Sequence, residues 1–440
     1  MKKTSGHSKV AETLCSKGDA FVRDEDFKQA LETFRAAIEA DKSIVLEHPL
    51  CQIAYNVNTT DGFKNLVKVL GAVYEIKQAL IWSPSEHPEP ISHYTGLKAL
   101  KNLVEGGKFR LYNADYMNDR EEGNAFWDFM DGNTQHDPRA KIHSHGEKKL
   151  LSPAYVGSFF REKHGSKDGE LFLWRTYGKN AEVEAAGACI YFDISKFSDT
   201  PPVHFGRMRF PEEPSTPHAQ LGWMLFPEEP STRPVRLLWG KSQLLWGDSQ
   251  SRLVWGSVSG KKSRPDSSPL QTECLYRVVY ASEIRPDEKG KIHSAKNEDL
   301  YKSLLKLAEK LDYIADNKWE SDEEEKNVYR MTRELLDEIR FLFKADDYRG
   351  EQELRIVQSH YTSEQVYSDE HDAENETSDI KPDVDHFPPR LYREVKSLGL
   401  QAVTLGPIVP DVLEWMHWLN WKKSDLEIHH SKISYGQKSL

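Results

Sequence analysis

The chain has 440 residues and a formal net charge of −11 at pH 7, and 38% of its residues are hydrophobic, which is enough for the cores of two or three domains. This charge argues against a general nucleic-acid coat protein, because phosphate binding depends on an excess of Lys and Arg. No apolar run approaches the ~20 residues of a membrane helix and no signal-peptide core is present, so we expect a cytoplasmic protein, or an effector exported by a non-classical route.

The four cysteines, Cys15, Cys51, Cys189 and Cys274, lie far apart in the sequence. No CxxC pair and no His/Cys motif occurs, so the sequence predicts reduced thiols, with neither a disulfide framework nor a zinc site. Cys189 falls within an apolar strand, which favours burial over a nucleophilic role.

Residues 8–41 have the spacing of a tetratricopeptide helix pair, in which small residues let the helices approach and aromatic residues fill the seam. A single clear copy is present, so this pair must pack on the next segment of the chain or on a partner. We expect a helical domain over residues 1–82 that is accessory, with an independent peptide-binding solenoid as the alternative. The positions that fit the pattern are Leu14, Gly18, Phe21, Ala30, Phe34 and Ala37.

The proline-rich segment 83–90 is predicted to be a linker, and an α+β domain is predicted over residues 91–440. A helix is expected at 96–105, with Thr95 as its N-cap and Gly106 and Gly107 as its stop. Further helices are expected near 297–315 and 325–344, interleaved irregularly with strands, which is typical of an α+β fold. Strands are expected at Lys108–Asn113, Val156–Phe160, Ala188–Phe192, Leu275–Tyr280, Leu354–Val357 and Val403–Leu405.

Residues 201–268 contain near-identical short repeats, FPEEPST twice and then three LLWG-like copies. Repeats this short are not folding units, so we interpret the segment as an inserted surface loop. The alternative is a recognition arm that uses Trp239, Trp246 and Trp255. The acidic stretch 368–385 is predicted to be a second solvated loop.

A polar cluster of Asn118, Asp119, Glu121 and Glu122 comes after the strand at 108–113. It suits an acid-rich helix start, and a metal site is the alternative, which would make the protein a metal-dependent nuclease. The sequence contains no GxSxG, no GxxxxGK[ST] and no HExxH motif.

Three further segments carry reactive residue types: Ser92–Thr95, Phe172–Gly178 and Tyr348–Val357. In an extended chain, alternate side chains share a face, so Glu351, Glu353 and Arg355 are expected to point the same way. Such a row is either a solvated ladder of charges or the edge of a catalytic site.

The motifs HYT, KFRLYNADYMND, LWRTYG, GACIYFD, YRGEQELRIV and LGPIVP, in this order, resemble the bacterial family catalogued as domain of unknown function 2971. The resemblance covers about residues 91–200 and 270–440. It departs from the family pattern at the AEVEAA insertion and at the long tandem insertion. The layout also resembles an ADP-ribosyltransferase of the His–Tyr–Glu type, which implies a split mixed or antiparallel sheet and NAD as substrate.

Cleavage of the nicotinamide–ribose bond creates an oxocarbenium-like centre that a carboxylate can stabilise. The resemblance assigns this role to Glu353, with Glu351 orienting or deprotonating the acceptor, and it implies that His93, Tyr177 and Glu353 converge on one cleft. The other implied cofactor-binding residues are Tyr94, Thr95, Ser158 and Arg175, with Arg355 as a second candidate for the pyrophosphate.

The implied function is an NAD-dependent toxin, effector or phage-defence enzyme that transfers ADP-ribose to a protein or nucleic-acid acceptor. Transfer to water would make it an NAD glycohydrolase. The rival interpretation is a non-catalytic interaction protein, in which the helical head and the Trp-rich insertion bind a protein partner.

Overall fold

In the computed structural model, the described chain forms two compact units. Unit 1 holds the described residues up to Gly71 together with Tyr313–Thr332, and unit 2 holds the others. The division falls within three helices, α4 (Thr60–Leu80), α10 (Ala295–Asp316) and α11 (Asp322–Arg340). The described residues are 9–46, 48–87, 90–116, 123–134, 152–161, 170–181, 183–198, 273–287, 291–292, 294–359, 380–383, 390–396 and 398–434.

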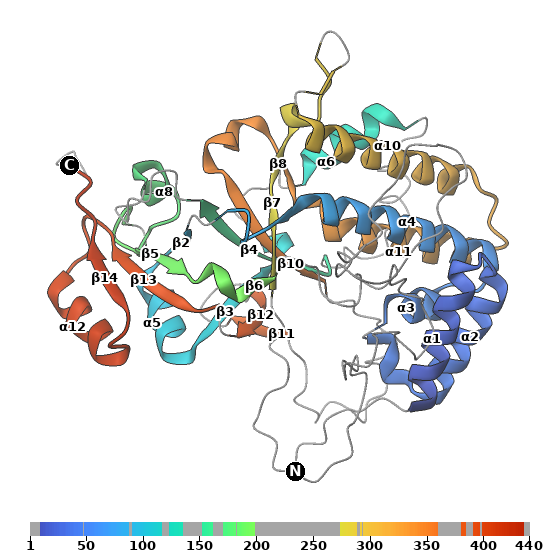
Figure 1. Ribbon diagram of the computed structural model, residues 1–440, viewed down its shortest axis with the longest axis horizontal. Coiled ribbons are helices and arrows are strands. Elements are labelled where there is room, and N and C mark those ends of the chain that lie inside the picture. The colour runs from blue at the N-terminus through green and yellow to red at the C-terminus, as the bar shows by residue number, and fades with distance from the viewer. Residues whose placement is uncertain are drawn as a thin grey trace, which may run out of the picture. The chain divides into compact units, whose positions relative to one another are not determined.

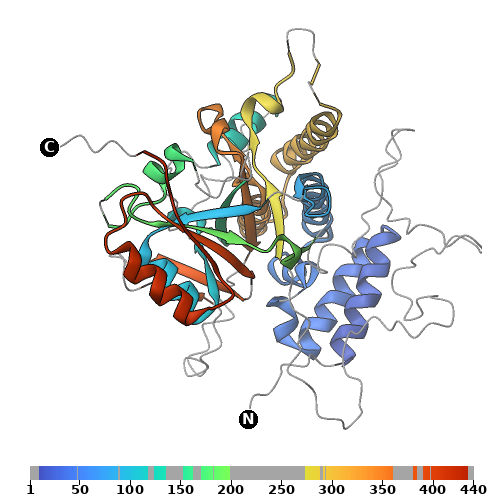
Figure 2. The ribbon, with the colours of Figure 1, turned by 60° about the vertical axis from the view of Figure 1, so that its left-hand side comes forward.

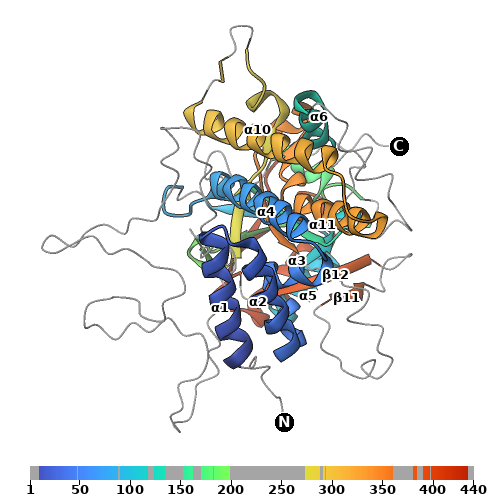
Figure 3. The ribbon, with the colours of Figure 1, turned by 90° about the vertical axis from the view of Figure 1, so that its right-hand side faces the viewer.

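Unit 1 begins with the predicted helix pair, α1 (Lys9–Arg23) and α2 (Phe27–Ala40), which lie side by side (Figure 3). Asp26 caps α2 by accepting a hydrogen bond from the backbone of Gln29 at 3.1 Å. A Cβ atom on Gly18 would lie 2.7 Å from the ring of Phe34, so only glycine permits this close approach. A short 3₁₀ turn, η1 (Lys42–Leu46), and the helix α3 (Pro49–Asn56) come next.

Unit 2 is built on a mixed sheet, so the α+β prediction is confirmed (Figure 1). The main path runs β1-β7-β10-β4-β2-β5-β13-β14, and β3, β12 and β11 extend from β4, while β6 pairs with β7. Most pairs are antiparallel, whereas β13–β14 and β6–β7 are parallel. The strands are β1 (Ile81–Trp82), β2 (Ile91–Thr95), β3 (Lys108–Asn113), β4 (Ala154–Arg161), β5 (Ala188–Phe192), β6 (Phe197–Ser198), β7 (Glu273–Arg277), β8 (Val279–Tyr280), β9 (Phe343–Lys344), β10 (Glu353–Ser359), β11 (Ile380–Asp383), β12 (Arg390–Lys396), β13 (Leu400–Leu405) and β14 (Glu427–His430).

The two faces of this sheet carry different cores. The α5 face, named for α5 (Leu97–Gly106), buries Ile91, Phe159 and Leu354 together with residues of α5 and α12 (Val412–Lys422). Figure 2 shows the ribbons of α5 and α12 beside the sheet. The α8 face, named for α8 (Leu171–Thr176), buries a second cluster that includes Tyr94 and Phe160. Because neighbouring residues of a strand point to opposite faces, the register of pairing decides which side chains can meet.

Several sequence predictions need correction at element ends. The N-cap of α5 is Gly96 and not Thr95, while Gly107 ends the helix in the left-handed conformation, as expected. Helix α11 ends at Arg340, because Phe343–Lys344 pair with β8 as strand β9. The predicted acidic loop contains strand β11, an edge strand that tolerates proline because it pairs only with β12.

Among the described residues, unit 2 also contains the helix α6 (Asn124–Asn133), and short 3₁₀ turns occur at η2 (Ala114–Tyr116), η3 (Ile194–Lys196), η4 (Ala281–Glu283) and η5 (Asp346–Glu351). Among the described residues, no helix combines the length and the apolar character needed to cross a membrane. The predicted insertion at 201–268 and the polar cluster Asn118, Asp119, Glu121 and Glu122 lie outside the described residues.

Candidate functional site

Three segments that are remote in sequence become neighbours in the sheet of unit 2. Strand β4 pairs with β10 on one side and with β2 on the other, so Glu353, Ser158 and His93 lie on adjacent strands. The register pairs Glu353 with Phe160 and Arg355 with Ser158, which places all four side chains on the α8 face. The sequence prediction that Glu353 and Arg355 share a face is therefore confirmed.

The start of β10 carries a buried ion cluster, which consists of Lys344, Glu351, Glu353 and Arg355. Lys344 Nζ lies 2.7 Å from Glu351 Oε2 and 3.0 Å from Glu353 Oε2. Arg355 donates two hydrogen bonds to the carboxylate of Glu353, of 2.7 and 2.9 Å, and also donates to the carbonyl oxygen of Phe341. All four residues are at most 5% exposed.

Tyr177 joins the ion cluster from the end of α8, because its hydroxyl donates to Glu351 Oε1 at 2.7 Å. Burial, and then the charge of Glu351, raise the pKa of the Tyr177 hydroxyl well above its ordinary value, so the tyrosine stays protonated. Burial would raise the pKa of Glu353, but Arg355 and Lys344 outweigh it and lower that pKa to about 2. The two carboxylates and two cations therefore balance, and each carboxylate already has its partners.

The sequence left two interpretations of the row Glu351, Glu353 and Arg355, a solvated ladder of charges or the edge of a catalytic site. The row is not a solvated ladder, because its charges are paired inside the core. Arg355, which is 0% exposed, cannot reach a pyrophosphate and is instead the partner of Glu353. Removing one member of such a buried pair strongly destabilises the fold, since the other charge would be left unpaired.

His93 lies on the opposite face of the sheet from the ion cluster. Its ring packs edge-on against Phe109 at 4.9 Å between centroids and also contacts Phe159, both of which belong to the core of the α5 face. Its Nδ1 lies 2.8 Å from the carbonyl oxygen of Ser158, which can only accept, so Nδ1 carries the hydrogen. Burial lowers the pKa of His93 and keeps the imidazole neutral.

The predicted convergence of His93, Tyr177 and Glu353 is therefore wrong for the histidine, because the β2–β4 register turns it away. The structure also places the other predicted cofactor-binding residues in different environments. Tyr94 is a core residue, only 3% exposed, whose hydroxyl accepts from the backbone of Glu170 at 2.9 Å. Thr95 ends β2 beside Ala188, and Arg175 is exposed on α8.

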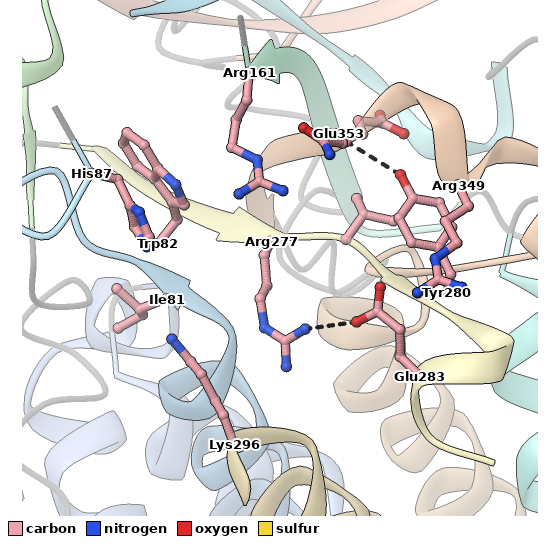
Figure 4. A pocket seen from close by; sticks show the side chains of 12 residues that line it. Ile81, Trp82, His87, Arg161, Arg277, Tyr280, Glu283, Lys296, Arg349 and Glu353 are labelled. Atoms are coloured by element: carbon pink, nitrogen blue, oxygen red, sulfur yellow. Dashed lines mark hydrogen bonds and ion pairs between the residues drawn. The ribbon is translucent and has the colours of Figure 1, made fainter. Parts of the chain in front are cut away.

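A cavity of about 250 Å³ opens elsewhere in unit 2, at the end of β4 and β7. Arg161 and Arg277, the last residues of these two strands, line it together with Lys296 and Arg349 (Figure 4). Trp82 forms one wall, and its ring stacks on that of His87 at 5.5 Å between centroids. We call this cavity the arginine pocket.

The charge of the arginine pocket is not balanced by its acids. Glu283 is bound to Arg277 at 3.1 Å, and the side chain of Glu353 belongs to the opposite face of the sheet. Burial lowers the pKa of Arg277, Glu283 raises it, and the charge of Arg161 lowers it further, so the two guanidinium groups repel each other. Two such groups side by side are stabilised by an anion between them.

Three buried donors around the arginine pocket have no acceptor among the described residues: Trp82 Nε1, Arg161 Nε and Arg277 Nε. Buried polar atoms in folded proteins nearly always have a partner, so each exception requires an explanation. A ligand that supplies several acceptor oxygens would satisfy all three donors at once.

Sequence reasoning missed this pocket, although a signal was present. Arg161 and Arg277 each come directly after an apolar strand segment, which places cations at strand ends where ligands often bind. The antiparallel register through β10, which brings the two strand ends together, is not visible in the sequence. Comparisons with protein-family models, with curated proteins and with solved structures found no match to this chain.

Proposed function

We propose that unit 2 binds a phosphorylated ligand of the nucleotide type in the arginine pocket. The observation that carries this proposal is the set of three buried donors without an acceptor among the described residues, in a pocket with an excess of cations. The planar guanidinium group matches the oxygen geometry of phosphate, and Trp82 and Tyr280 offer flat surfaces for a base or a sugar.

The size of the arginine pocket limits which part of the ligand it holds. Its volume of about 250 Å³ is below the range of roughly 300–1,000 Å³ that is typical of sites for drug-sized ligands. It therefore suits a diphosphate with part of the attached group, rather than a complete dinucleotide.

We further propose that the ligand is NAD and that the reaction is ADP-ribosyl transfer. The specific observation in favour is that Tyr177, Glu351 and Glu353 meet at the start of β10, and that the backbone N–H of Glu353 donates to the hydroxyl of Tyr280, which lines the arginine pocket. In this proposal the diphosphate binds Arg161 and Arg277, and His93 has no role. The acceptor is a protein or a nucleic acid.

An ADP-ribosyltransferase type of sheet and a tetratricopeptide-like head belong to the same proposal. The adjacent order of β10, β4 and β2 supports the first, since such a site is split over strands from remote segments. The close approach of Gly18 to the ring of Phe34 supports the second, and in this proposal the helix pair binds a protein partner.

The test is calorimetric titration of the full chain with ADP-ribose, adenosine and inorganic pyrophosphate, followed by an assay of nicotinamide release from NAD. We expect ADP-ribose and pyrophosphate to bind and adenosine to bind far more weakly. Failure of both anions to bind would overturn the pocket proposal. Binding of ADP-ribose without any nicotinamide release, in the presence of cell lysate as a source of acceptor, would overturn the transferase proposal alone.

A further inference from the structure

Two cysteines and a histidine that are separated in the sequence meet in unit 1. Cys15 Sγ and Cys51 Sγ are 3.3 Å apart, and the ligand atoms of Cys15, His48 and Cys51 all lie within 4.8 Å of one another. The sequence predicted no zinc site, because no His/Cys motif is visible in it. The motif is split between two helices that pack together only in the folded chain.

The positions of these residues derive from helix geometry. Cys15 and Asp19 are four residues apart on α1, so they lie on the same side of that helix. His48 is the N-cap of α3, and Cys51 is three residues later in the first turn of the same helix. Each helix thus presents two possible ligands, one pair from α1 and one pair from α3.

The spacing suits a tetrahedral thiophilic cation. Zinc binds cysteine sulfur at about 2.3 Å and histidine nitrogen at about 2.0–2.1 Å, so two thiolates that share one zinc ion lie ~3.7 Å apart. The observed sulfur separation of 3.3 Å needs only a small expansion to reach this value. Both cysteines are at most 4% exposed, which shields such a centre from water.

Polar atoms beside the sulfurs provide a second, independent observation. Asp19 Oδ1 and His48 Nδ1 are buried and have no hydrogen-bond partner among the described residues. His48 Nε2 lies 3.6 Å from Asp19 Oδ1, which is too long for a hydrogen bond but places a carboxylate beside the imidazole. A carboxylate in this position commonly orients a metal-bound histidine.

We propose that Cys15, His48 and Cys51 bind a zinc-class divalent cation, and that Asp19 is a positioning residue for the imidazole. Binding releases the two thiol protons to solvent, and the two thiolates then form bonds to the cation with no change in oxidation state. Burial raises the pKa of the Cys51 thiol, so this thiol stays protonated without metal, and the cation would provide the charge that stabilises its thiolate. The centre would link α1 to the start of α3.

The experiment uses the full chain, purified under anaerobic reducing conditions, with metal analysis and with Co²⁺ as a spectroscopic probe. We expect about one zinc ion per chain, and thiolate-to-cobalt charge-transfer absorption with the visible bands of a tetrahedral site. The variants Cys15→Ser and Cys51→Ser should lose the charge-transfer absorption. Cys189→Ser and Cys274→Ser, which replace buried cysteines outside unit 1, should retain it.

Two measurements keep the proposal testable if the cysteine variants do not fold. In the folded wild-type chain, zinc should protect Cys15 and Cys51 from alkylation, and a chelator should expose them. Asp19→Asn should weaken Co²⁺ affinity by about 10–100-fold while the tetrahedral spectrum is preserved. Cobalt that binds without thiolate absorption, or a mass showing loss of two hydrogens through a Cys15–Cys51 disulfide in the chain as isolated, would overturn the proposal.

Discussion

At the start of β10, the two faces of the sheet differ in how far their charged side chains are balanced by partners within the chain. On the α8 face, the ion cluster pairs Lys344 and Arg355 with two glutamates at 2.7–3.0 Å. On the other face, Arg161 and Arg277 meet at a cavity where buried donors lack acceptors among the described residues. Residue type alone does not separate the two groups, because both contain arginine and glutamate. The difference is whether the chain itself supplies the partners.

This comparison separates a structural role from a ligand-binding role. Paired buried charges stabilise one arrangement of the chain and cannot be removed singly without a large cost. Cations that face a cavity repel each other until an anion arrives, so their removal affects binding more than folding. Single substitutions on the two faces test that separation, from the largest expected effect to the smallest.

Loss of one carboxylate from the ion cluster should destabilise the fold strongly. We expect Glu353→Gln to lower the free energy of unfolding by about 3–5 kcal/mol, because Lys344 and Arg355 would keep their buried charges without this partner. Denaturant unfolding measures the difference. The matched control is Glu298→Gln, at an exposed pair with Lys302, which should leave the unfolding midpoint essentially unchanged. Equal effects at the two positions would refute a structural role for the cluster.

The stability contributed by Glu353 should depend on pH in a defined direction. Its folded pKa is about 2, below the ordinary value of 4.5, so this stability is fully present above pH 4.5 and is lost as the pH falls toward 2. The difference corresponds to roughly 3 kcal/mol. Unfolding of the wild type and of Glu353→Gln should therefore be compared at several pH values. A gap that widens on acidification would contradict the assignment.

Removal of one cation from the arginine pocket should affect binding more than folding. Arg161→Gln should weaken pyrophosphate binding by about 10–100-fold, since a charge-assisted hydrogen bond contributes about 1.5–3 kcal/mol. Its free energy of unfolding should change by less than about 0.5 kcal/mol, because a repulsion disappears together with the charge. Arg285→Gln, an arginine outside the pocket, is the control and should bind normally. A large loss of stability in Arg161→Gln would place this residue with the ion cluster.

The smallest expected effect concerns the hydroxyl that connects α8 to the ion cluster. Tyr177→Phe removes the donor to Glu351 but leaves the ring contact with Phe160, so we expect a loss of about 1–2 kcal/mol in the free energy of unfolding. The control Tyr313→Phe lies at a side chain that is 60% exposed and should be neutral. If Tyr177→Phe abolished pyrophosphate binding instead, the hydroxyl would belong to the ligand site.

Sequence patterns predicted the local structure well where one face of an element is apolar. The strands Lys108–Asn113 and Ala188–Phe192 have the predicted bounds, and Glu353 and Arg355 share a face as alternation requires. Glu351 joins the same cluster from a 3₁₀ turn, because Lys344 reaches it from β9. That contact depends on a short strand that the sequence suggested was helical.

The sequence predictions that failed share one physical cause, because each depended on how distant segments of the chain pair. His93 was expected at the site, but the register of β2 against β4 turns it to the other face. The same kind of information brings Cys15 beside Cys51 and Arg161 beside Arg277. A shift of one residue in strand pairing reverses the side-chain faces, and local propensity does not encode that shift.

The most direct test of the contrast between the two faces is a crystal structure of the full chain with inorganic pyrophosphate. We predict pyrophosphate oxygens within hydrogen-bonding distance of Arg161, Arg277 and Trp82, with the ion cluster unchanged on the other face. Pyrophosphate bound instead at Tyr177 and Lys344, or an arginine pocket without pyrophosphate at saturating concentration, would contradict this prediction.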